Sequence, residues 1–576
     1  MIVRSPHNNR YSLFSVLLSF PYSSQDSLLA ELPSPSGTEP QFFVCPPADP
    51  AVPYTSIRGF SDRAVTLMHV AIDRGGTFTD FISRYHVTFS FAGRHMDRLS
   101  ILSENTTINV VRHFRQSEVV MTMKLPSVDT RYDDAPSHGI AMLLDAFEQT
   151  FETISQQSDC IKTLRLEHHF DSKSAIPINN IASIRMGTTV ATNALLERTG
   201  AKVALFVTAG FEDLISIGTQ ARMQLFNLDI EKPSMLCSHV VGVRERVVVE
   251  SEHGKHLSQG STVVIQLDES QVRDELSRVF ELGFRSIAVS LLHSHKADHH
   301  ERTVQGIANQ FAFENVSISS QLMPMAGYLM RTSSTILDAY LTPCINEYLS
   351  AFRKRFERQL DGIPLYFMQS DGGLTSAQNF RGFRAVLSGP AGGVIGCNVA
   401  VKQSCGQLVP SVGFDMGGTS TDITRLDGSC DIDVTMESTI AGVHILAPQV
   451  SVDTVAAGGG SIIQWKNGFF SVGPQSAGAV PGPMCYGRGG PLTVTDANLM
   501  LGRLVPDFFP CVFGLDGRSQ LSTAVVECAF EELAVCITRE TGRQWNAIQV
   551  ALACIRVANE SMCRPIRQIT EMKGYR

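Results

Sequence analysis

The chain has 576 residues, of which 43% are apolar, and a formal net charge of −8. This length exceeds what one hydrophobic core can organise, so we expect two to four domains. The net negative charge and the lack of long Lys or Arg runs argue against nucleic-acid binding and against an anionic membrane surface. The 13 cysteines are scattered and never form Cys-x-x-Cys, which is typical of reduced cytoplasmic thiols. We therefore expect a cytoplasmic protein that acts on a small molecule.

Residues 1–64 precede the first organised segment and predict a disordered or mispredicted N-terminal extension. Arg4 and Arg10 stand before a short apolar run that weakly resembles a targeting peptide, and residues 21–53 are rich in Pro and Ser. No stretch reaches the roughly 18 to 20 uninterrupted apolar residues of a membrane span. The sequence therefore predicts no membrane partner.

The first organised segment, residues 65–72, is an apolar run of strand length. It is followed by DRGGTFTD at 73–80 and the short apolar run FIS, which together predict strand, loop, strand. The loop returns as DMGGTSTD at 415–422, between SVGF and ITRL, with six of the eight positions identical. A Walker loop or a dinucleotide fingerprint would need a helix after the loop and a different glycine spacing.

Apolar runs at 202–208 and 286–292 predict buried strands, and residues 268–283 predict an amphipathic helix. This alternation indicates an α/β protein. The Gly-rich segments 370–373, 388–393, 456–461 and 472–491 read as turns with close backbone approaches. Residues 545–569 predict a helix that Pro565 kinks or breaks.

The doubled loop repeats one set of chemical groups: a carboxylate at a strand end, two glycines, a threonine and a second carboxylate. Loop amides, the hydroxyls of Thr77 and Thr419, and Mg²⁺ held partly by Asp73 and Asp415 through water would neutralise a triphosphate. We therefore favour two phosphate-binding hairpins that face each other across a cleft. The alternative is a pair of ordinary Gly-rich turns.

Two further segments carry weaker signals. RMGTTVATNALLERTG, at 185–200, is a Gly-Thr-Thr turn that leads into a helix. An anion site at the helix start and an ordinary N-cap by Thr188 or Thr189 both stay open. HSHKADHH, at 293–300, lacks the helical His-x-x-x-His spacing of a robust metal site, so we favour solvated loop histidines.

Together, AIDRGGTFTD, RMGTTVATNALLERTG, MQSDGGLT, VLSGPAGGV, GFDMGGTSTDI and the 472–504 segment closely resemble the hydantoinase A and 5-oxoprolinase family. The Arg of AIDRGG is similar to the ATP-hydrolysing 5-oxoprolinases. The resemblance covers roughly residues 65–576. It implies an N-terminal-like domain at 65–265 and a hydantoinase A-like domain at 266–576. The implied fold is α/β, with duplicated domains similar to actin, Hsp70 and sugar kinases, additional α/β insertions, and closure over ATP.

The resemblance implies ATP-dependent opening of 5-oxo-L-proline to L-glutamate in glutathione metabolism, through phosphorylation of the lactam oxygen, with ATP and Mg²⁺ as cofactors. It gives Asp73 and Asp415 catalytic and metal-binding roles. The phosphate-loop residues that match are Gly75, Gly76, Thr77 and Asp80 in the first copy and Gly417, Gly418, Thr419 and Asp422 in the second. Candidate partners for the lactam carboxylate are Arg74, Arg222 and Arg331. An ATP-dependent hydantoinase or related carboxylase, and an inactive nucleotide-binding fragment or scaffold, stay open as alternatives.

The chain departs from the family pattern in two places. Residues 82–123 read as an atypical insert, for which we hypothesise an unspliced or mispredicted segment. The chain also stops where the family continues into an adenosine-contacting element and, in full-length 5-oxoprolinases, into the hydantoinase B half. We therefore expect a C-terminally truncated protein that lacks this partner half, and a homodimer stays open.

Overall fold

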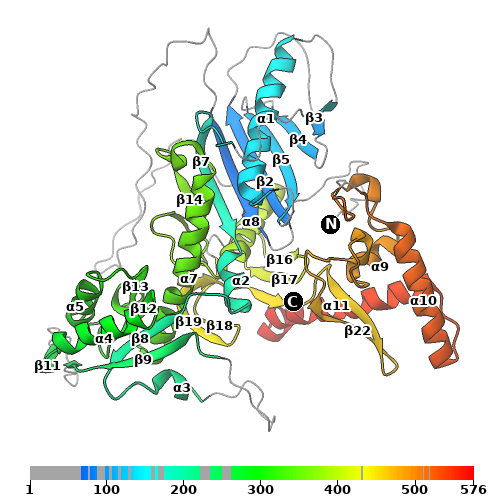
Figure 1. The fold of residues 1–576 in the computed structure, drawn as a ribbon. Helices are drawn as coiled ribbons and strands as arrows, with labels where there is room; N and C mark the ends of the chain where they lie inside the picture. Colours follow the sequence, from blue (N-terminus) through cyan, green and yellow to red (C-terminus); the bar gives the residue numbers. More distant parts are fainter. Residues whose placement is uncertain are drawn as a thin grey trace.

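The structure is a computed structural model. It describes residues 67–75, 78–86, 98–102, 107–113, 118–127, 132–156, 163–165, 174–220, 234–249, 261–429, 432–509, 512–517 and 519–575. The predicted extension at 1–64, the loop residues Gly76 and Thr77, and Arg222 lie outside the described residues. The described elements confirm a mixed α/β protein, and Figure 1 shows them in three parts around a shared centre.

The first part is a nine-stranded sheet in the order β15-β14-β7-β1-β2-β5-β4-β3-β6. Its strands are β1 (Met68–Arg74), β2 (Phe78–His86), β3 (Arg98–Leu102), β4 (Thr107–His113), β5 (Glu118–Pro126), β6 (Thr163–Arg165), β7 (Ile181–Thr188), β14 (Leu365–Met368) and β15 (Leu374–Ser376). The strand β1 pairs antiparallel with β2 and parallel with β7. The described parts of the predicted insert 82–123 thus extend this sheet at its outer side.

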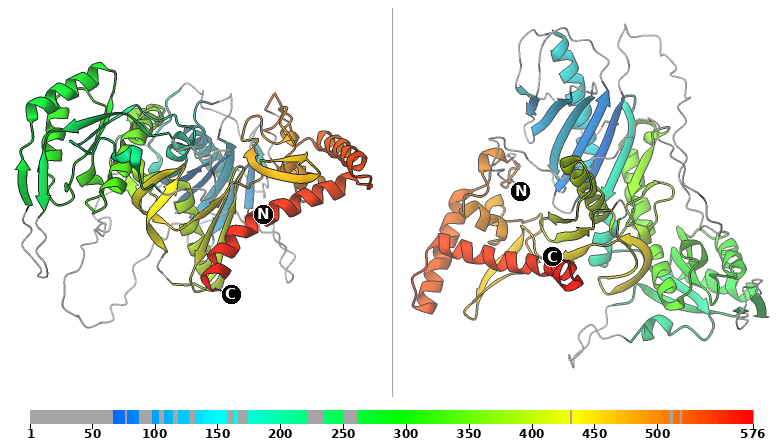
Figure 2. Two further views of the ribbon diagram at one scale, coloured as in Figure 1. Left: turned by 90° about the horizontal axis from the view of Figure 1, so that it is seen from below. Right: turned by 180° about the vertical axis from the view of Figure 1, so that it is seen from behind.

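Helices cover this sheet because its strands carry apolar residues on their inner faces. The helix α1 (Ala135–Gln156) contacts β1, β2 and β5, and its Gly139 lies against the ring of Phe81. The helix α8 (Ser388–Cys405) contacts β7, β14 and β16. The view from behind shows α8 between the nine-stranded sheet and the third part of the molecule (Figure 2). This placement puts the start of α8 at the centre of the structure.

The second part is a parallel sheet in the order β13-β12-β8-β9. Its strands are β8 (Val203–Thr208), β9 (Cys237–Val243), β12 (Ser286–Ser290) and β13 (Asn315–Ile318), with a hairpin of β10 (Arg246–Val249) and β11 (Ser261–Ile265). The helices here are α2 (Val190–Leu196), α3 (Leu214–Ile217), α4 (Glu269–Glu281), α5 (His299–Ala308), α6 (Ser319–Leu322) and α7 (Tyr328–Lys354). The predicted strands and the predicted helix at 268–283 are confirmed, and Asp268 caps α4 by accepting from the Gln271 amide at 3.0 Å.

The third part carries the second loop. Its strands are β16 (Ser411–Met416), β17 (Thr421–Leu426), β18 (Val434–Ile440), β19 (Val443–Val450), β20 (Asp453–Val455), β21 (Ser461–Lys466) and β22 (Phe469–Ser476). Its helices are α9 (Val494–Met500), α10 (Thr523–Thr541) and α11 (Ala547–Ile569). A separate hydrophobic cluster that includes Phe530 and Val550 holds these helices to the strands. A kink or a break was predicted at Pro565: the break is wrong, because α11 continues to Ile569 with Pro565 buried inside it, and the kink stays a prediction.

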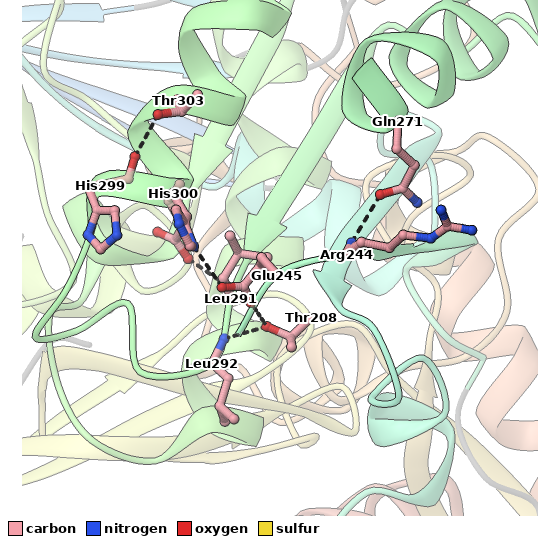
Figure 3. A network of polar contacts seen from close by, with 10 residues as sticks. Thr208, Arg244, Glu245, Gln271, Leu291, Leu292, His299, His300 and Thr303 are labelled. Atoms are coloured by element: carbon pink, nitrogen blue, oxygen red, sulfur yellow. Dashed lines mark hydrogen bonds and ion pairs between the residues drawn. The ribbon is translucent and has the colours of Figure 1, made fainter. Parts of the chain in front are cut away.

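Two other local predictions are corrected. Residues 388–393 do not form a turn, because they are the first turns of α8. The histidine segment is not a fully solvated loop, because His299 and His300 begin α5 and His300 is buried. Figure 3 shows the reason: His300 Nδ1 lies 2.8 Å from Glu245 Oε2, and the Thr208 hydroxyl donates to the other oxygen of Glu245.

We expect Glu245→Ala to destabilise the second part, because Thr208 and His300 would lose their shared acceptor in a buried place. Each buried polar group left unpaired costs about 1–3 kcal/mol. A lower thermal unfolding midpoint measures this effect. Glu275→Ala is the control, since Glu275 pairs with Arg278 within the same helix near the surface and such pairs contribute about 0–1 kcal/mol. Equal midpoints for the two variants would show that the buried network contributes no stability.

The segment Gly382–Cys405, which includes α8, is long and apolar enough to cross a membrane by length and composition alone. Core helices of soluble proteins pass the same test. Here α8 packs against strands of three sheets. The absence of a membrane partner stays a prediction.

Candidate functional site

The two repeated loops are hairpins with the same pairing. In the first, Asp73 stands opposite Asp80 across β1 and β2; in the second, Asp415 stands opposite Asp422 across β16 and β17. The same backbone hydrogen bond closes both turns. The Gly75 amide donates to the Phe78 carbonyl at 3.0 Å, and the Gly417 amide donates to the Ser420 carbonyl at 2.9 Å. The sequence repeat is therefore a structural repeat, and the predicted strand, loop, strand pattern is confirmed at both copies.

A fully buried threonine supports each hairpin from behind. The Thr79 hydroxyl lies 3.0 Å from the Ser127 hydroxyl, which donates to the Gly75 carbonyl at 2.6 Å. In the second copy, the Thr421 hydroxyl donates to the Ala457 carbonyl at 2.6 Å. These hydrogen bonds fix each loop to the chain behind it.

The second hairpin also rests directly on a glycine segment. The amides of Gly459 and Gly460 donate to the carbonyls of Gly417 and Gly418 at 2.9 and 2.6 Å. A Cβ on Gly458 would lie 2.8 Å from both of those carbonyl oxygens. The backbones approach closely because these positions lack side chains. The Gly-rich turn expected at 456–461 is thus the support of the second loop.

Asp73 and Asp415 line the same small cavity. The two hairpins belong to different sheets, so this meeting depends on the packing of the whole chain. The lining residues are Ile72, Asp73, Arg185, Met186, Gly187, Met368, Leu374, Ser388, Gly389, Gly392, Gly393 and Asp415.

The wall between the two carboxylates consists of small residues. A Cβ on Gly187 would lie 3.2 Å from Asp73 Oδ1, and a Cβ on Gly393 would lie 4.0 Å from Asp415 Oδ2. The Ser388 hydroxyl, at the start of α8, donates to the Met368 carbonyl at 2.8 Å and so ties the helix to β14. The wall glycines of α8 are absent from the predicted site, and the motif SGPAGG was their only signal in the sequence.

Burial and mutual repulsion perturb the carboxylates. Burial raises the pKa of Asp73 from 3.8 to about 7, with further contributions from Asp80 and Asp415. Burial and then Asp80 raise the pKa of Asp415. Burial also raises the pKa of Asp422, which accepts a 2.6 Å hydrogen bond from Thr454. Crowded, poorly solvated carboxylates are stabilised in their charged form by a nearby cation.

Lys124, at the end of β5, provides one such cation. Its ammonium group donates to both oxygens of Asp80 at 2.7 and 2.8 Å. Among the described residues, no three or more His, Cys, Asp or Glu side chains form a metal-binding group. In proteins, Mg²⁺ keeps several waters and takes only one or two carboxylates when phosphate oxygens complete its shell. Asp73 and Asp415 fit that role.

The structure places the predicted arginines differently from one another. The Arg74 guanidinium lies 4.9 Å from the centre of the Tyr348 ring. Arg331 is 1% exposed and donates to Ser319 Oγ and to the carbonyls of Leu291 and Met325 in the second part of the molecule, at 2.8 to 3.1 Å. Neither lines the cavity, and the buried contacts of Arg331 are those of a structural residue. Arg185, which is not among the predicted arginines, does line it.

The fold and the site define a mixed α/β protein in which two matching glycine hairpins each place one strand-end aspartate in the wall of one cavity. The model of the hydantoinase/oxoprolinase N-terminal region matches residues 69–312, and that of the hydantoinase/oxoprolinase family matches residues 331–576. The chain belongs to the hydantoinase/oxoprolinase family, as its motifs predict.

Two relatives that are named as 5-oxoprolinases support the same family assignment. The chain is 42% identical to 5-oxoprolinase 1 of Arabidopsis thaliana over 525 residues and 40% identical to the 5-oxoprolinase of Saccharomyces cerevisiae over 526 residues. Each match covers 88% of this chain and 37% of the relative. The chain thus spans little more than a third of the length of these relatives.

Two solved structures share the fold. The crystal structure of the ATP-dependent caprolactamase of Pseudomonas jessenii matches with a TM-score of 0.57 and 26% identity, over 88% of this chain and 64% of that chain. The nucleotide-free acetone carboxylase matches with a TM-score of 0.61 and 22% identity, over 88% and 63%. Each match covers the same share of this chain, 88%, as the matches to the two relatives.

Proposed function

We propose that this chain carries the ATP-using site of an enzyme that hydrolyses 5-oxo-L-proline to L-glutamate. The observation that carries the proposal is the delivery of Asp73 and Asp415, by two hairpins with the same register, to the wall of one cavity. The similarity to 5-oxoprolinases supports the choice of substrate. The matched hairpins also support an arrangement in which duplicated domains of the actin, Hsp70 and sugar-kinase type close over ATP.

The chemistry explains why ATP is needed. A lactam is a poor electrophile because resonance strengthens its C–N bond. Transfer of the γ-phosphoryl group from ATP to the lactam oxygen gives ADP and an activated imidate. Water then adds to the same carbon, and the ring C–N bond breaks to leave a free amine and an acyl phosphate. A second water displaces phosphate from the acyl carbon and gives the carboxylate of glutamate. The first step depends mainly on positioning and charge neutralisation.

The two hairpins supply that positioning. The amides of Gly75 and Gly417 close the two turns, and the turns hold the strand-end aspartates Asp73 and Asp415 in matching registers. Mg²⁺ bound by Asp73 and Asp415, partly through water, would neutralise phosphate charge. Asp80 and Asp422 stand directly opposite these two aspartates and lie at the base of each loop.

The later hydrolysis steps, the metabolic role and the cellular location belong to the same proposal. Because the named relatives are much longer, we assign completion of the hydrolysis to a hydantoinase B-like half. We place the reaction in glutathione metabolism and in the cytoplasm. A lactam of another ring size, or a hydantoin, is the second candidate substrate, since the caprolactamase structure has the same fold.

Release of phosphate from ATP tests the function. We expect release that depends on 5-oxo-L-proline and on Mg²⁺, measured for the chain alone and together with a hydantoinase B-like half. If phosphate release depends on hydantoins or caprolactam instead, the proposed substrate is wrong and the assignment of the ATP site stands. Nucleotide binding without release under any of these conditions would show an inactive scaffold.

Gly458→Ala tests the support of the second hairpin. The added Cβ would press on the carbonyls of Gly417 and Gly418, so we expect the loop to shift and turnover to fall by about tenfold or more. Gly306→Ala is the control, because a Cβ there meets no atom within 4 Å in α5 and alanine is favoured in helices. Full activity in both variants would show that the glycine segment does not position the loop.

A further inference from the structure

Each hairpin is joined by a third strand, and the cross-strand pairing again matches. The strand β5 pairs antiparallel with β2 and places Lys124 directly opposite Asp80. The strand β20 pairs antiparallel with β17 and places Thr454 directly opposite Asp422. Residues that stand directly opposite each other share one face of a sheet. Each hairpin therefore carries a row of three side chains on one face: the strand-end aspartate, the second aspartate and the residue of the third strand.

The third residue of each row donates to the second aspartate, but the two donors differ in charge. Lys124 Nζ donates to the two oxygens of Asp80 at 2.7 and 2.8 Å. The Thr454 hydroxyl donates to Asp422 at 2.6 Å, so a neutral hydroxyl is sufficient for this contact. The side chains of Lys124 and Asp80 are about half exposed, and ion pairs at such exposure contribute little stability. The positive charge of Lys124 therefore points to a use beyond holding Asp80.

The Lys124 ammonium lies against the first loop. It is 5.2 Å from the centre of the Phe78 ring, and the Phe78 carbonyl accepts from the Gly75 amide to close the turn. Burial, and then the neighbouring carboxylate in the row, raise the pKa of Asp73 and of Asp415, and the charge of Lys124 opposes both shifts. This charge thus acts on the loop and on both aspartates of the cavity.

The charge of the site favours a further cation when a nucleotide is bound. The two hairpins bring together four aspartates, which are Asp73, Asp80, Asp415 and Asp422. A triphosphate adds more negative charge, and one Mg²⁺ offsets only part of the total. Phosphoryl transfer depends on cations that stabilise the charge of the transferring group. A lysine suits this task, because its ammonium is a compact charge on a flexible stem.

We propose that Lys124 binds the phosphoryl group that ATP transfers to the lactam oxygen. The proposal rests on the proposed function and deepens it. When ATP binds, the ammonium turns from Asp80 to the phosphoryl oxygens and binds them as a point charge. The loop stays in place, because the hydrogen bond from Gly75 to Phe78 closes the turn without Lys124.

Equilibrium binding of ATP and of ADP, each with Mg²⁺ and without lactam, tests the assignment. Lys124→Thr gives the first row the residue type of the second, so a hydroxyl still faces Asp80. We expect this variant to weaken ATP binding by about 10- to 100-fold and to leave ADP binding unchanged. The unchanged ADP affinity also shows that the variant is folded. Lys124→Arg keeps the charge and should recover part of the loss, because its planar fork places the charge differently.

Lys466→Thr is the matched control. It removes the same charge at the exposed end of β21, away from the residues that line the cavity, and should leave both affinities unchanged. If the wild-type chain binds neither nucleotide, the proposed function is wrong and the role of Lys124 fails with it. If the wild-type chain binds ATP and Lys124→Thr binds it equally well, only the assignment of Lys124 is overturned. An equal loss of ATP and ADP affinity would also overturn it, because Lys124 would then not distinguish the transferred phosphoryl group.

Discussion

Asp415→Asn is expected to abolish Mg²⁺-dependent nucleotide turnover while the protein stays folded. Asn has nearly the same shape but no charge, so it cannot share a divalent cation with Asp73. Loss of an electrostatic contact to a transferring phosphoryl group costs about 100-fold or more in turnover. The fold should survive, because Asp415 is exposed in the ligand-free protein and Asn keeps nearly the same shape. Phosphate release and circular dichroism measure the two halves of this expectation.

The control for this variant is Asp427→Asn. Asp427 lies just beyond β17, is exposed, and accepts hydrogen bonds from Ser429. It carries the same charge but lies outside the cavity, so the variant should keep full turnover. Unchanged ATPase activity in Asp415→Asn would remove the phosphate-site assignment altogether.

Asp73→Asn is expected to stabilise the ligand-free protein, and more so at high pH. Asp73 has a pKa of about 7 in the folded chain against an ordinary value of 3.8. Between these values the folded state holds the extra proton, so the contribution of Asp73 to the free energy of unfolding falls as pH rises. The destabilisation caused by ionising Asp73 in the folded protein is complete above pH 7 and small near pH 4. Asn cannot ionise, so the variant should show little gain near pH 4 and its largest gain at pH 8.

Thermal unfolding midpoints of wild type and Asp73→Asn at pH 5 and pH 8 measure this difference, with about 2–4 °C expected for each kcal/mol removed. Asp268→Asn is the contrasting control. A hydrogen bond from the Gln271 amide lowers the pKa of Asp268, so the stability that Asp268 adds is present at high pH and lost as pH falls. That variant should therefore not gain stability at pH 8. An Asp73→Asn gain that is the same at both pH values would mean that Asp73 is not held in a crowded, poorly solvated place.

The sequence predicts the local parts of the site well. Each hairpin is encoded within about a dozen residues by apolar runs and a glycine pair, and the repeat identifies both copies. The helix at 268–283 also follows from local periodicity and its Asp268 cap. Such features depend on near neighbours, which a sequence pattern records.

The rest depends on contacts between distant segments. Arg185 reaches the cavity only because β7 pairs in parallel with β1, and a sequence pattern does not show which strands will pair. SGPAGG predicts a turn by its composition, yet it begins α8 because the helix packs against β7 and β14. Tertiary packing overrides local preference there. His300 is polar by type but buried, because Glu245 lies across from it.

The separation of the two hairpins affects how the protein should melt. The first hairpin is part of the nine-stranded sheet and the second is part of a different sheet with its own hydrophobic cluster. Without a ligand, the two parts are free to lose their structure at different temperatures. A metal-bound phosphate that contacts Asp73 and Asp415 at once binds only when both parts are folded. Its binding therefore couples the unfolding of the two parts. In calorimetry, two separate unfolding transitions without ligand should merge into one transition when the ligand is bound.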